Sequence, residues 1–192
     1  MADFTIPLWN SMGLIPPIDE SDPTSLARSP YEIDIIRFVT LFALSPVRVT
    51  ILKGFLTFRH ELYSVGILDG FQWIDGSFTE NIELIERRSP NDVDVVTFFN
   101  YLNNDSDEAI VGRNPIVFDH DHVKKTYLVD SFFQPLQVPG GQLVDMTGYW
   151  YSMWSHKRDS SWKGFLKIPL SPQQDQVAMT ILNNATAGGG EQ

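Results

Sequence analysis

The stretch 73-WIDGSFTENIELIERRSPNDVDVVTFF-99 decides the fold that we expect for this chain. It opens with a short apolar run that ends at Asp75-Gly76-Ser77, and it closes on a second apolar run headed by Asp92 and Asp94. Residues two apart in an extended chain point to the same face, so Asp92 and Asp94 project together while Val93 points away. The stretch therefore predicts two strands and a candidate site at the start of the second.

The two carboxylates predict a cation at this site. Side chains of like charge held this close repel each other unless they are solvated or share a cation. Ligation by oxygen alone suits Mg²⁺ (or Mn²⁺), and Mg²⁺ is typically held by one or two carboxylates plus substrate phosphates. Gly76 lets the backbone approach a ligand closely, and the amides of the helix expected after Ser77 favour an anion. Together these features predict a nucleoside triphosphate (NTP), with its phosphates at Gly76-Ser77 and the metal at the Asp pair.

Ordinary structural roles explain each part separately. Ser77-x-x-Glu80 is a capping box, and on this interpretation Ser77 caps the helix that follows. The Asn91-Asp92 pair after Ser89-Pro90 also suits a turn that leads into a strand. The combination of the Gly-Ser turn, the Asp pair and the strand favours the functional interpretation.

The same residues resemble the polymerase-beta-like nucleotidyltransferase superfamily, in which Gly-Ser is followed by Asp-x-Asp at the head of a strand. The spacing from Ser77 to Asp92 is long for that superfamily. It suits a narrower family of small, mostly uncharacterised bacterial nucleotidyltransferase-like proteins, whose likeness extends over most of the chain after about Pro46. The residues that carry it are Asp75-Gly76-Ser77-Phe78, Glu80, Ile82-Glu83, Pro90 and Asp92-Val93-Asp94-Val95-Val96-Thr97.

This resemblance implies an α+β fold, with a mixed β-sheet flanked by helices, in which the Asp pair and a third acid on a neighbouring strand hold two metal ions. Asp130 is the natural third ligand, because it is the only charge in the strand predicted from Tyr127 to Phe133. An isolated carboxylate in an apolar strand is costly unless it is paired or metal-bound. The expected catalytic and metal-binding residues are Asp92, Asp94 and Asp130, and the expected nucleotide-binding residues are Gly76, Ser77 and Lys163.

Composition sets the class of protein. The 192 residues are enough for one domain with a sizeable core, and 43% are hydrophobic while 20% are charged. The chain has no apolar run long enough to span a membrane and no secretory signal, so a cytoplasmic protein is expected. It has no cysteine, which excludes disulfides and thiolate zinc sites.

The net charge of −10 argues against a broad nucleic-acid surface, since such binding depends on Lys and Arg that neutralise phosphates. Basic residues after the Asp pair either gather near the phosphates or form an ordinary solvated surface, and both interpretations stay open. Among the aromatic residues mixed with them, Trp150 and Trp154 are expected in the core because they are four residues apart. Lys163 is expected to act on the nucleotide, and Lys157 and Arg158 are further candidates for the same role.

Local patterns divide the chain into an irregular arm (residues 1–28), a single domain (residues 29–184) and a flexible tail (residues 185–192). Ser-Pro pairs predict three helix starts, at Ser29-Pro30, Ser45-Pro46 and Ser171-Pro172. Predicted strands cover residues 67–74, 92–101 and 114–118, and an acidic loop covers residues 103–108.

The segment Asp119-His120-Asp121-His122 has the residue types of a zinc site. No third and fourth ligand follows at a regular spacing, so we expect a loop before a strand.

The predicted function is the metal-dependent transfer of a nucleoside monophosphate from an NTP to a hydroxyl acceptor on a protein, a small molecule or, second, an RNA. The resemblance adds toxin–antitoxin and phage-defence pairs as settings. One alternative is a non-catalytic module that keeps the fold and docks to a partner protein. Another is a metal-dependent phosphohydrolase, which would not need the Gly-Ser turn.

Overall fold

The computed structural model describes residues 6–102 and 105–187, and its centre is a five-stranded mixed sheet. The strands are β1 (Tyr31–Glu32), β2 (Asp69–Asp75), β3 (Val93–Asn100), β4 (Val129–Pro135) and β5 (Leu166–Pro169). Their order is β1-β5-β2-β3-β4, with β2 antiparallel to both of its neighbours and the two outer pairs parallel. This arrangement confirms the predicted α+β fold with a mixed sheet.

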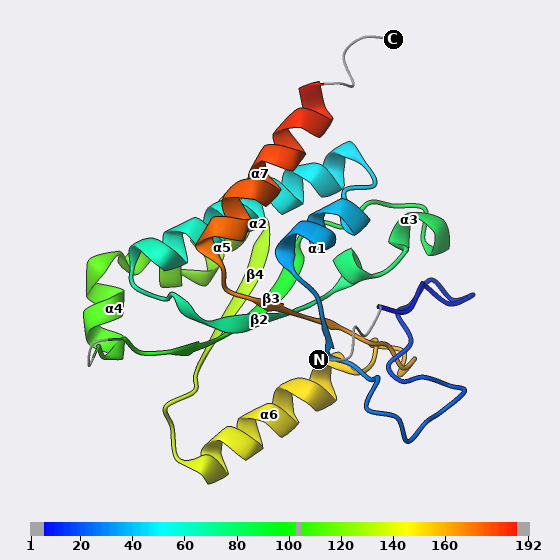
Figure 1. Cartoon of the computed structure of the whole chain (residues 1–192), viewed down its shortest axis with the longest axis horizontal. Coiled ribbons are helices and arrows are strands. Elements are labelled where there is room, and N and C mark those ends of the chain that lie inside the picture. Colours follow the sequence, from blue (N-terminus) through cyan, green and yellow to red (C-terminus); the bar gives the residue numbers. More distant parts are fainter. Residues whose placement is uncertain (1–5, 103–104, 188–192) are drawn as a thin grey trace.

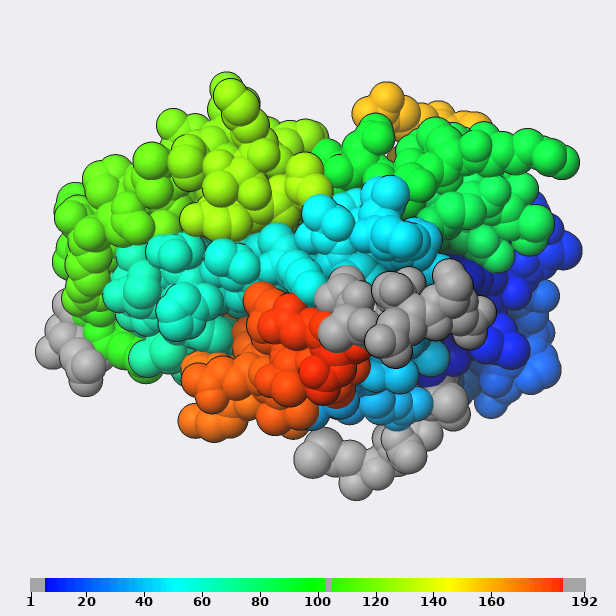
Figure 2. Space-filling model, turned by 90° about the horizontal axis from the view of Figure 1, so that it is seen from above, coloured from blue at the N-terminus to red at the C-terminus, as the bar shows by residue number. Residues whose placement is uncertain are grey.

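Helices cover both faces of this sheet unequally. The helices are α1 (Ile35–Phe42), α2 (Pro46–Ser64), α3 (Ile82–Ile85), α4 (Asp107–Arg113), α5 (His120–Tyr127), α6 (Gly140–Trp154) and α7 (Pro172–Ala187), with 3-10 turns η1 (Ser77–Thr79) and η2 (Pro115–Phe118). In Figure 1, α1, α2, α5 and α7 lie above the sheet and α6 lies below it. Figure 2 shows the upper layer from outside, with α7 (orange to red) lying beside α2 (cyan to turquoise).

Strand alternation divides the core between these two faces. Ile74, Val93 and Val95 point to the upper layer, where they join the larger core with α2 residues such as Phe55. The smaller core lies between the sheet and α6 and contains Trp73, Val96, Phe98, Trp150, Trp154 and Phe165. The predicted core positions of both α6 tryptophans are confirmed.

Only two of the three Ser-Pro pairs start a helix at the predicted place. The Ser45 side chain accepts a hydrogen bond from the Arg48 N–H and caps α2, as predicted, and α7 begins at Pro172. The prediction at Ser29-Pro30 is wrong, because Tyr31 and Glu32 extend the sheet as β1 and Asp34 caps α1 instead.

Two further predictions, for the segment of residues 114–122, are wrong. Residues 115–118 form the 3-10 turn η2 and not a strand. Asp119 accepts a hydrogen bond from the His122 N–H and caps α5, so His120 opens a helix and not a loop. A short apolar run does not distinguish strand from helix, and here the cap decides.

The ends of the predicted loop and tail differ from expectation or lie outside the described residues. Residues 103–104 of the predicted acidic loop lie outside them, whereas Asp105 pairs with Arg113 and α4 begins at Asp107. Helix α7 continues to Ala187, so the predicted tail starts inside a helix, and residues 188–192 lie outside the described residues.

Where the structure describes it, the arm of residues 6–28 has neither helix nor named strand, in agreement with the prediction. It packs on the segment that follows β2, because the Trp9 indole N–H donates to the Thr79 carbonyl and the Asn81 N–H donates to the Gly13 carbonyl. Among residues 6–102 and 105–187, no helix combines the length and apolarity needed to cross a membrane.

Candidate acidic site on strands β2, β3 and β4

Three aspartates from three neighbouring strands lie side by side, and we call them the acidic row: Asp75, Asp94 and Asp130. Asp94 is in register with Asp75 on one side and with Asp130 on the other. Residues in register point to the same face of a sheet, here the face that α6 covers farther along the strands. Asp92 precedes Asp94 by two residues and projects to the same side. The structure therefore brings together the predicted Asp92, Asp94 and Asp130 and adds Asp75, which sequence reasoning did not place in the site.

Asp94 lies at the centre of the row without a counter-charge of its own. Within the described residues, its carboxylate has no hydrogen-bond or ion-pair partner. Burial, followed by the charges of Asp75, Asp92 and Asp130, raises the pKa of Asp94 to about 7. A carboxyl group in this state either keeps a proton near neutral pH or needs a cation.

The Asp75 end of the row is neutralised by Lys163. The Lys163 Nζ lies 3.0 Å from Asp75 Oδ1 and 2.9 Å from Glu80 Oε1, and it donates to the Gly76 carbonyl at 3.2 Å. Burial works to lower the pKa of Lys163, but Asp75 and Glu80 together raise it. The side chain is only 5% exposed, so its ammonium faces these protein oxygens and not an open phosphate site.

The Asp130 end is neutralised by helix α5. The Lys124 Nζ lies 3.0 Å from Asp92 Oδ2 and also contacts Asp130 Oδ2, while His120 Nε2 lies 2.7 Å from Asp130 Oδ1. Burial works to raise the pKa of Asp130, but hydrogen bonds from Lys124 and His120 outweigh it and hold the pKa below its usual value. Of the two states that the sequence left open for this carboxylate, paired or metal-bound, the structure shows the paired one.

Gly76 is required at the turn beside Asp94. Its φ is +81°, a conformation that side chains disfavour, and a Cβ placed there would lie 2.4 Å from Asp94 Oδ2. Ser77 then opens the three-residue turn η1, and α3 begins only at Ile82 after Asn81. The expected helix N-terminus at Ser77 is therefore wrong, and so is the alternative that Ser77 caps the next helix.

A buried arginine holds this turn in place. The Arg48 side chain is fully buried and donates to the carbonyls of Phe78 and Glu80, each at 2.6 Å. It also pairs with Glu83 at 2.6 Å.

The sequence carried a signal for this Arg48 contact, because an arginine between the apolar residues of an amphipathic helix needs buried acceptors. For His120 and Lys124 the signal was their spacing of four residues on a helix capped by Asp119.

The carboxylates are not arranged as a closed metal site. Among residues 6–102 and 105–187, no group of three or more His, Cys, Asp or Glu side chains is placed to hold a metal ion. Lys124 occupies the space between Asp92 and Asp130. His120 faces Asp130, whereas His122 Nε2 lies 3.3 Å from the Thr126 hydroxyl, so the two histidines do not converge.

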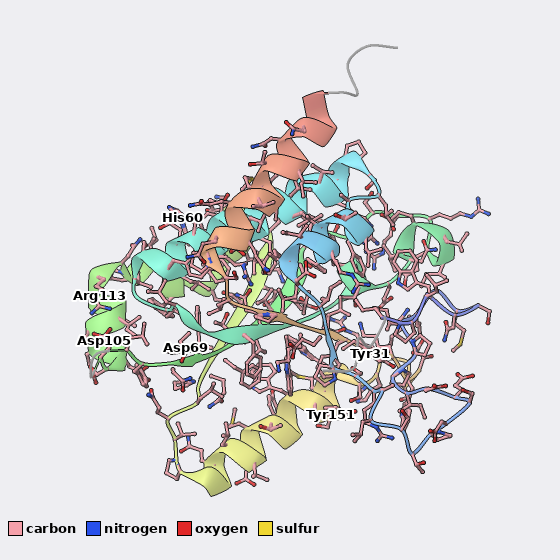
Figure 3. The ribbon with its side chains drawn as sticks, viewed as in Figure 1. Tyr31, His60, Asp69, Asp105, Arg113 and Tyr151 are labelled. Carbon is pink, nitrogen blue, oxygen red and sulfur yellow. The ribbon has the colours of Figure 1, made fainter. Side chains whose placement is uncertain are left out.

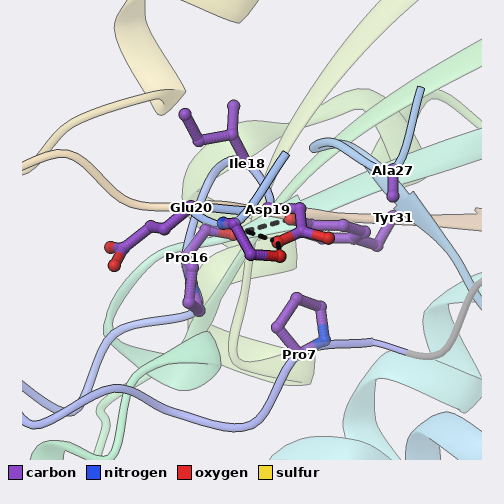
Figure 4. A pocket seen from close by; sticks show the side chains of 8 residues that line it. Pro7, Pro16, Ile18, Asp19, Glu20, Ala27 and Tyr31 are labelled. Atoms are coloured by element: carbon purple, nitrogen blue, oxygen red, sulfur yellow. Dashed lines mark hydrogen bonds between the residues drawn. The ribbon is translucent and has the colours of Figure 1, made fainter. Parts of the chain in front are cut away.

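Two surface hollows lie away from the acidic row. One of about 380 Å³ is formed mainly by the arm and Tyr31, and Figure 4 shows Asp19 and Tyr31 at its wall. The other, of about 740 Å³, follows β1 and the start of α7. Neither is lined by Asp75, Asp94 or Asp130.

Strand β2 carries Asp75 of the acidic row at its C-terminal end and Asp69 at its N-terminal end, and Figure 3 shows Asp69 on the side of α4.

Residues 7–169 match a family of unknown function (DUF6932). Searches of curated proteins and of solved structures find no match.

Proposed function

We propose that this chain, which belongs to the DUF6932 family, is a metal-dependent nucleotidyltransferase that moves a nucleoside monophosphate from an NTP to a hydroxyl acceptor. The observation that carries the proposal is the isolated position of Asp94. Its neighbours in the acidic row each contact a lysine, whereas no lysine, arginine or histidine of the described residues forms an ion pair with Asp94, and the charge of Lys163 lowers the pKa of Asp94 less than burial or any of the neighbouring aspartates raises it. Perturbed acids of this kind gather at functional sites more often than elsewhere.

The chemistry of the donors suits the proposed metal. Asp92, Asp94 and Asp130 offer only carboxylate oxygens, which hard cations such as Mg²⁺ and Mn²⁺ prefer. We propose that these three residues hold the ion. When bound, such an ion stabilises charge on the phosphates and lowers the pKa of an attacking hydroxyl.

Other residues of the chain position the nucleotide in this proposal. Gly76 leaves backbone beside Asp94 without a side chain, which suits the close approach of a phosphate, and the half-buried Ser77 adds a hydroxyl. Lys163 was predicted to bind the phosphates, but its contacts favour another role, which is to hold the Gly76 carbonyl and Asp75 in place. Catalysis would then come mainly from positioning and electrostatics, as in other phosphoryl-type transfers.

The acceptor is proposed from charge alone. A chain with a net charge of −10 is repelled by phosphate backbones, so a protein or a small molecule is favoured over RNA. The toxin–antitoxin or phage-defence setting rests only on the resemblance of the Gly-Ser and Asp-x-Asp motifs.

Thermal melting with Mn²⁺ or Mg²⁺ and each of the four NTPs tests the proposal. An NTP at about 100 times its Kd stabilises the folded state by about 2.7 kcal/mol, which corresponds to a rise in Tm of roughly 5–10 °C for a domain of this size. We expect one NTP with metal to produce this shift in the native chain and not in an Asp92→Ala, Asp94→Ala double variant.

The matched control is Asp69→Asn, which changes an exposed aspartate at the other end of β2 and should leave the shift intact. An NTP that shifts the native chain can then be labelled and used to find the acceptor. A native chain that no NTP stabilises in the presence of metal contradicts the catalytic proposal.

A second candidate is the non-catalytic module that docks to a partner protein. It is favoured by one observation, namely that Lys124 and Lys163 already neutralise much of the acidic row. Capture of one partner protein by the native chain and by the double aspartate variant alike, without any NTP effect on melting, would support this candidate.

A further inference from the structure

We infer that Lys124 is an internal counter-cation of the acidic site, which occupies the position between Asp92 and Asp130 and leaves it when a divalent cation binds. The inference rests on the proposed metal site and deepens it, because it names the residue that sets the affinity of that site. Lys124 was one of several basic residues whose role the sequence left open.

The contacts of Lys124 place its charge where a metal shared by these carboxylates would lie. Its Nζ is 3.0 Å from Asp92 Oδ2 and also contacts Asp130 Oδ2. Oxygen ligands of Mg²⁺ lie about 2.0–2.1 Å from the ion. An ion bound to both carboxylates would therefore take the space that the ammonium fills, and the two positive charges would repel each other at short range.

Lys124 is able to leave this position. Its side chain is 43% exposed and extends from α5 on a flexible stem, so the ammonium has a path to solvent. Asp130 keeps a partner after such a movement, because His120 contacts its other oxygen, Oδ1. The loss of Lys124 would thus free one oxygen on Asp130 and one on Asp92 for a metal.

The lysine at the other end of the row lacks this freedom. The Lys163 side chain is 5% exposed and contacts Asp75, Glu80 and the Gly76 carbonyl. Both lysines neutralise aspartates of the same row, but only Lys124 has a solvent-exposed exit. This difference identifies Lys124, and not Lys163, as the cation that a metal replaces.

Titration of the purified chain with Mn²⁺ alone tests the inference. We expect Lys124→Met to bind Mn²⁺ roughly tenfold more tightly than the native chain, because a competing positive charge has been removed. Lys124→Arg keeps the charge and should stay close to native. Lys125→Met changes the next, exposed residue of α5 and controls for the loss of one surface charge.

A second measurement uses the native chain and does not depend on the folding of a variant. Acylation of lysines, followed by mass spectrometry, should label Lys124 several-fold faster after Mn²⁺ is added, while Lys125 reacts at an unchanged rate. The labelling reports the movement of the ammonium directly.

The outcomes separate this inference from the proposed function. If the native chain binds Mn²⁺ and Lys124→Met binds it equally or more weakly, or if Lys124 labelling does not rise, the inference is overturned while the metal site stands. If neither the native chain nor Lys124→Met binds Mn²⁺, the proposed metal site fails and the inference fails with it.

Discussion

The buried charges around Arg59 and around Asp94, on opposite faces of the sheet, differ in how they are paired. Above the sheet, Arg59 of α2 pairs with Asp175 at 2.6 Å and donates to Gln72 Oε1 at 2.7 Å and to the Pro169 carbonyl at 2.9 Å. The Tyr63 hydroxyl completes this network by donating to Asp175. On the α6 face, Asp94 lies among three other aspartates, and no cation in the described part of the chain pairs with it.

This difference is the one expected between a structural cluster and the functional site that we propose. A buried ion pair is tolerated when hydrogen bonds satisfy every partner, as they do around Arg59. A buried acid with like-charged neighbours costs folding free energy, and proteins keep such arrangements mainly at functional sites. The comparison therefore predicts that substitutions in the two clusters change stability in opposite directions.

The largest expected effect is from Arg59→Leu. The variant leaves the Asp175 carboxylate buried without its arginine, and removal of one partner of a buried pair typically costs about 3–5 kcal/mol. Urea denaturation measures this loss. The matched control is Arg88→Leu, which removes an ion pair to Glu86 whose side chains are both 43% exposed and should cost less than about 1 kcal/mol. Equal losses in the two variants would contradict a structural role for the Arg59 network.

Asp94→Asn should raise the folding stability, where Arg59→Leu lowers it, and the size of this gain should depend strongly on pH. The raised pKa of about 7 means that the folded state holds a proton which the unfolded state releases near pH 4. The contribution of Asp94 to native stability therefore falls as pH rises from about 4 to about 7. Asparagine does not titrate, so the variant should be more stable than the native chain by roughly 2–4 kcal/mol at pH 8 and nearly equal to it at pH 4.

Urea denaturation without metal across this pH range checks the prediction. A variant that is less stable than the native chain at pH 8 would mean that Asp94 is an ordinary, well-paired carboxylate.

Gly76→Ala should have the smallest of the three effects. The positive φ and the 2.4 Å approach of the new Cβ to Asp94 Oδ2 together predict a loss of about 1–3 kcal/mol. Much of the clash involves the Asp94 carboxylate, so the same substitution should cost less in an Asp94→Ala background. A double-mutant cycle measures this coupling, and strictly additive changes in stability would show that Gly76 is required for its φ alone.

Local patterns predicted the parts of the fold that depend on neighbouring residues. The alternation of Asp92, Val93 and Asp94 predicted which side chains share a face, and the Ser45 cap predicted the start of α2. The same capping logic was wrong at Ser29, because the Tyr31 N–H donates to the Phe165 carbonyl and the Ile33 N–H donates to the Lys167 carbonyl, more than 130 residues away in sequence. A tertiary contact there overrides a local preference.

The features of the candidate site also fall into those that local sequence predicted and those that tertiary contacts decided. The sequence by itself determined that Asp92 and Asp94 project together, that glycine stands at position 76, and that Asp130 is the only charge in its strand, because these features follow from backbone periodicity and composition. Only the tertiary structure decided that Asp75 joins the row, that Lys163 is buried against it, and that His120 and Lys124 reach Asp130. These contacts depend on the register between strands and on the packing of α5 beside β4, and neither is encoded in the spacing of nearby residues.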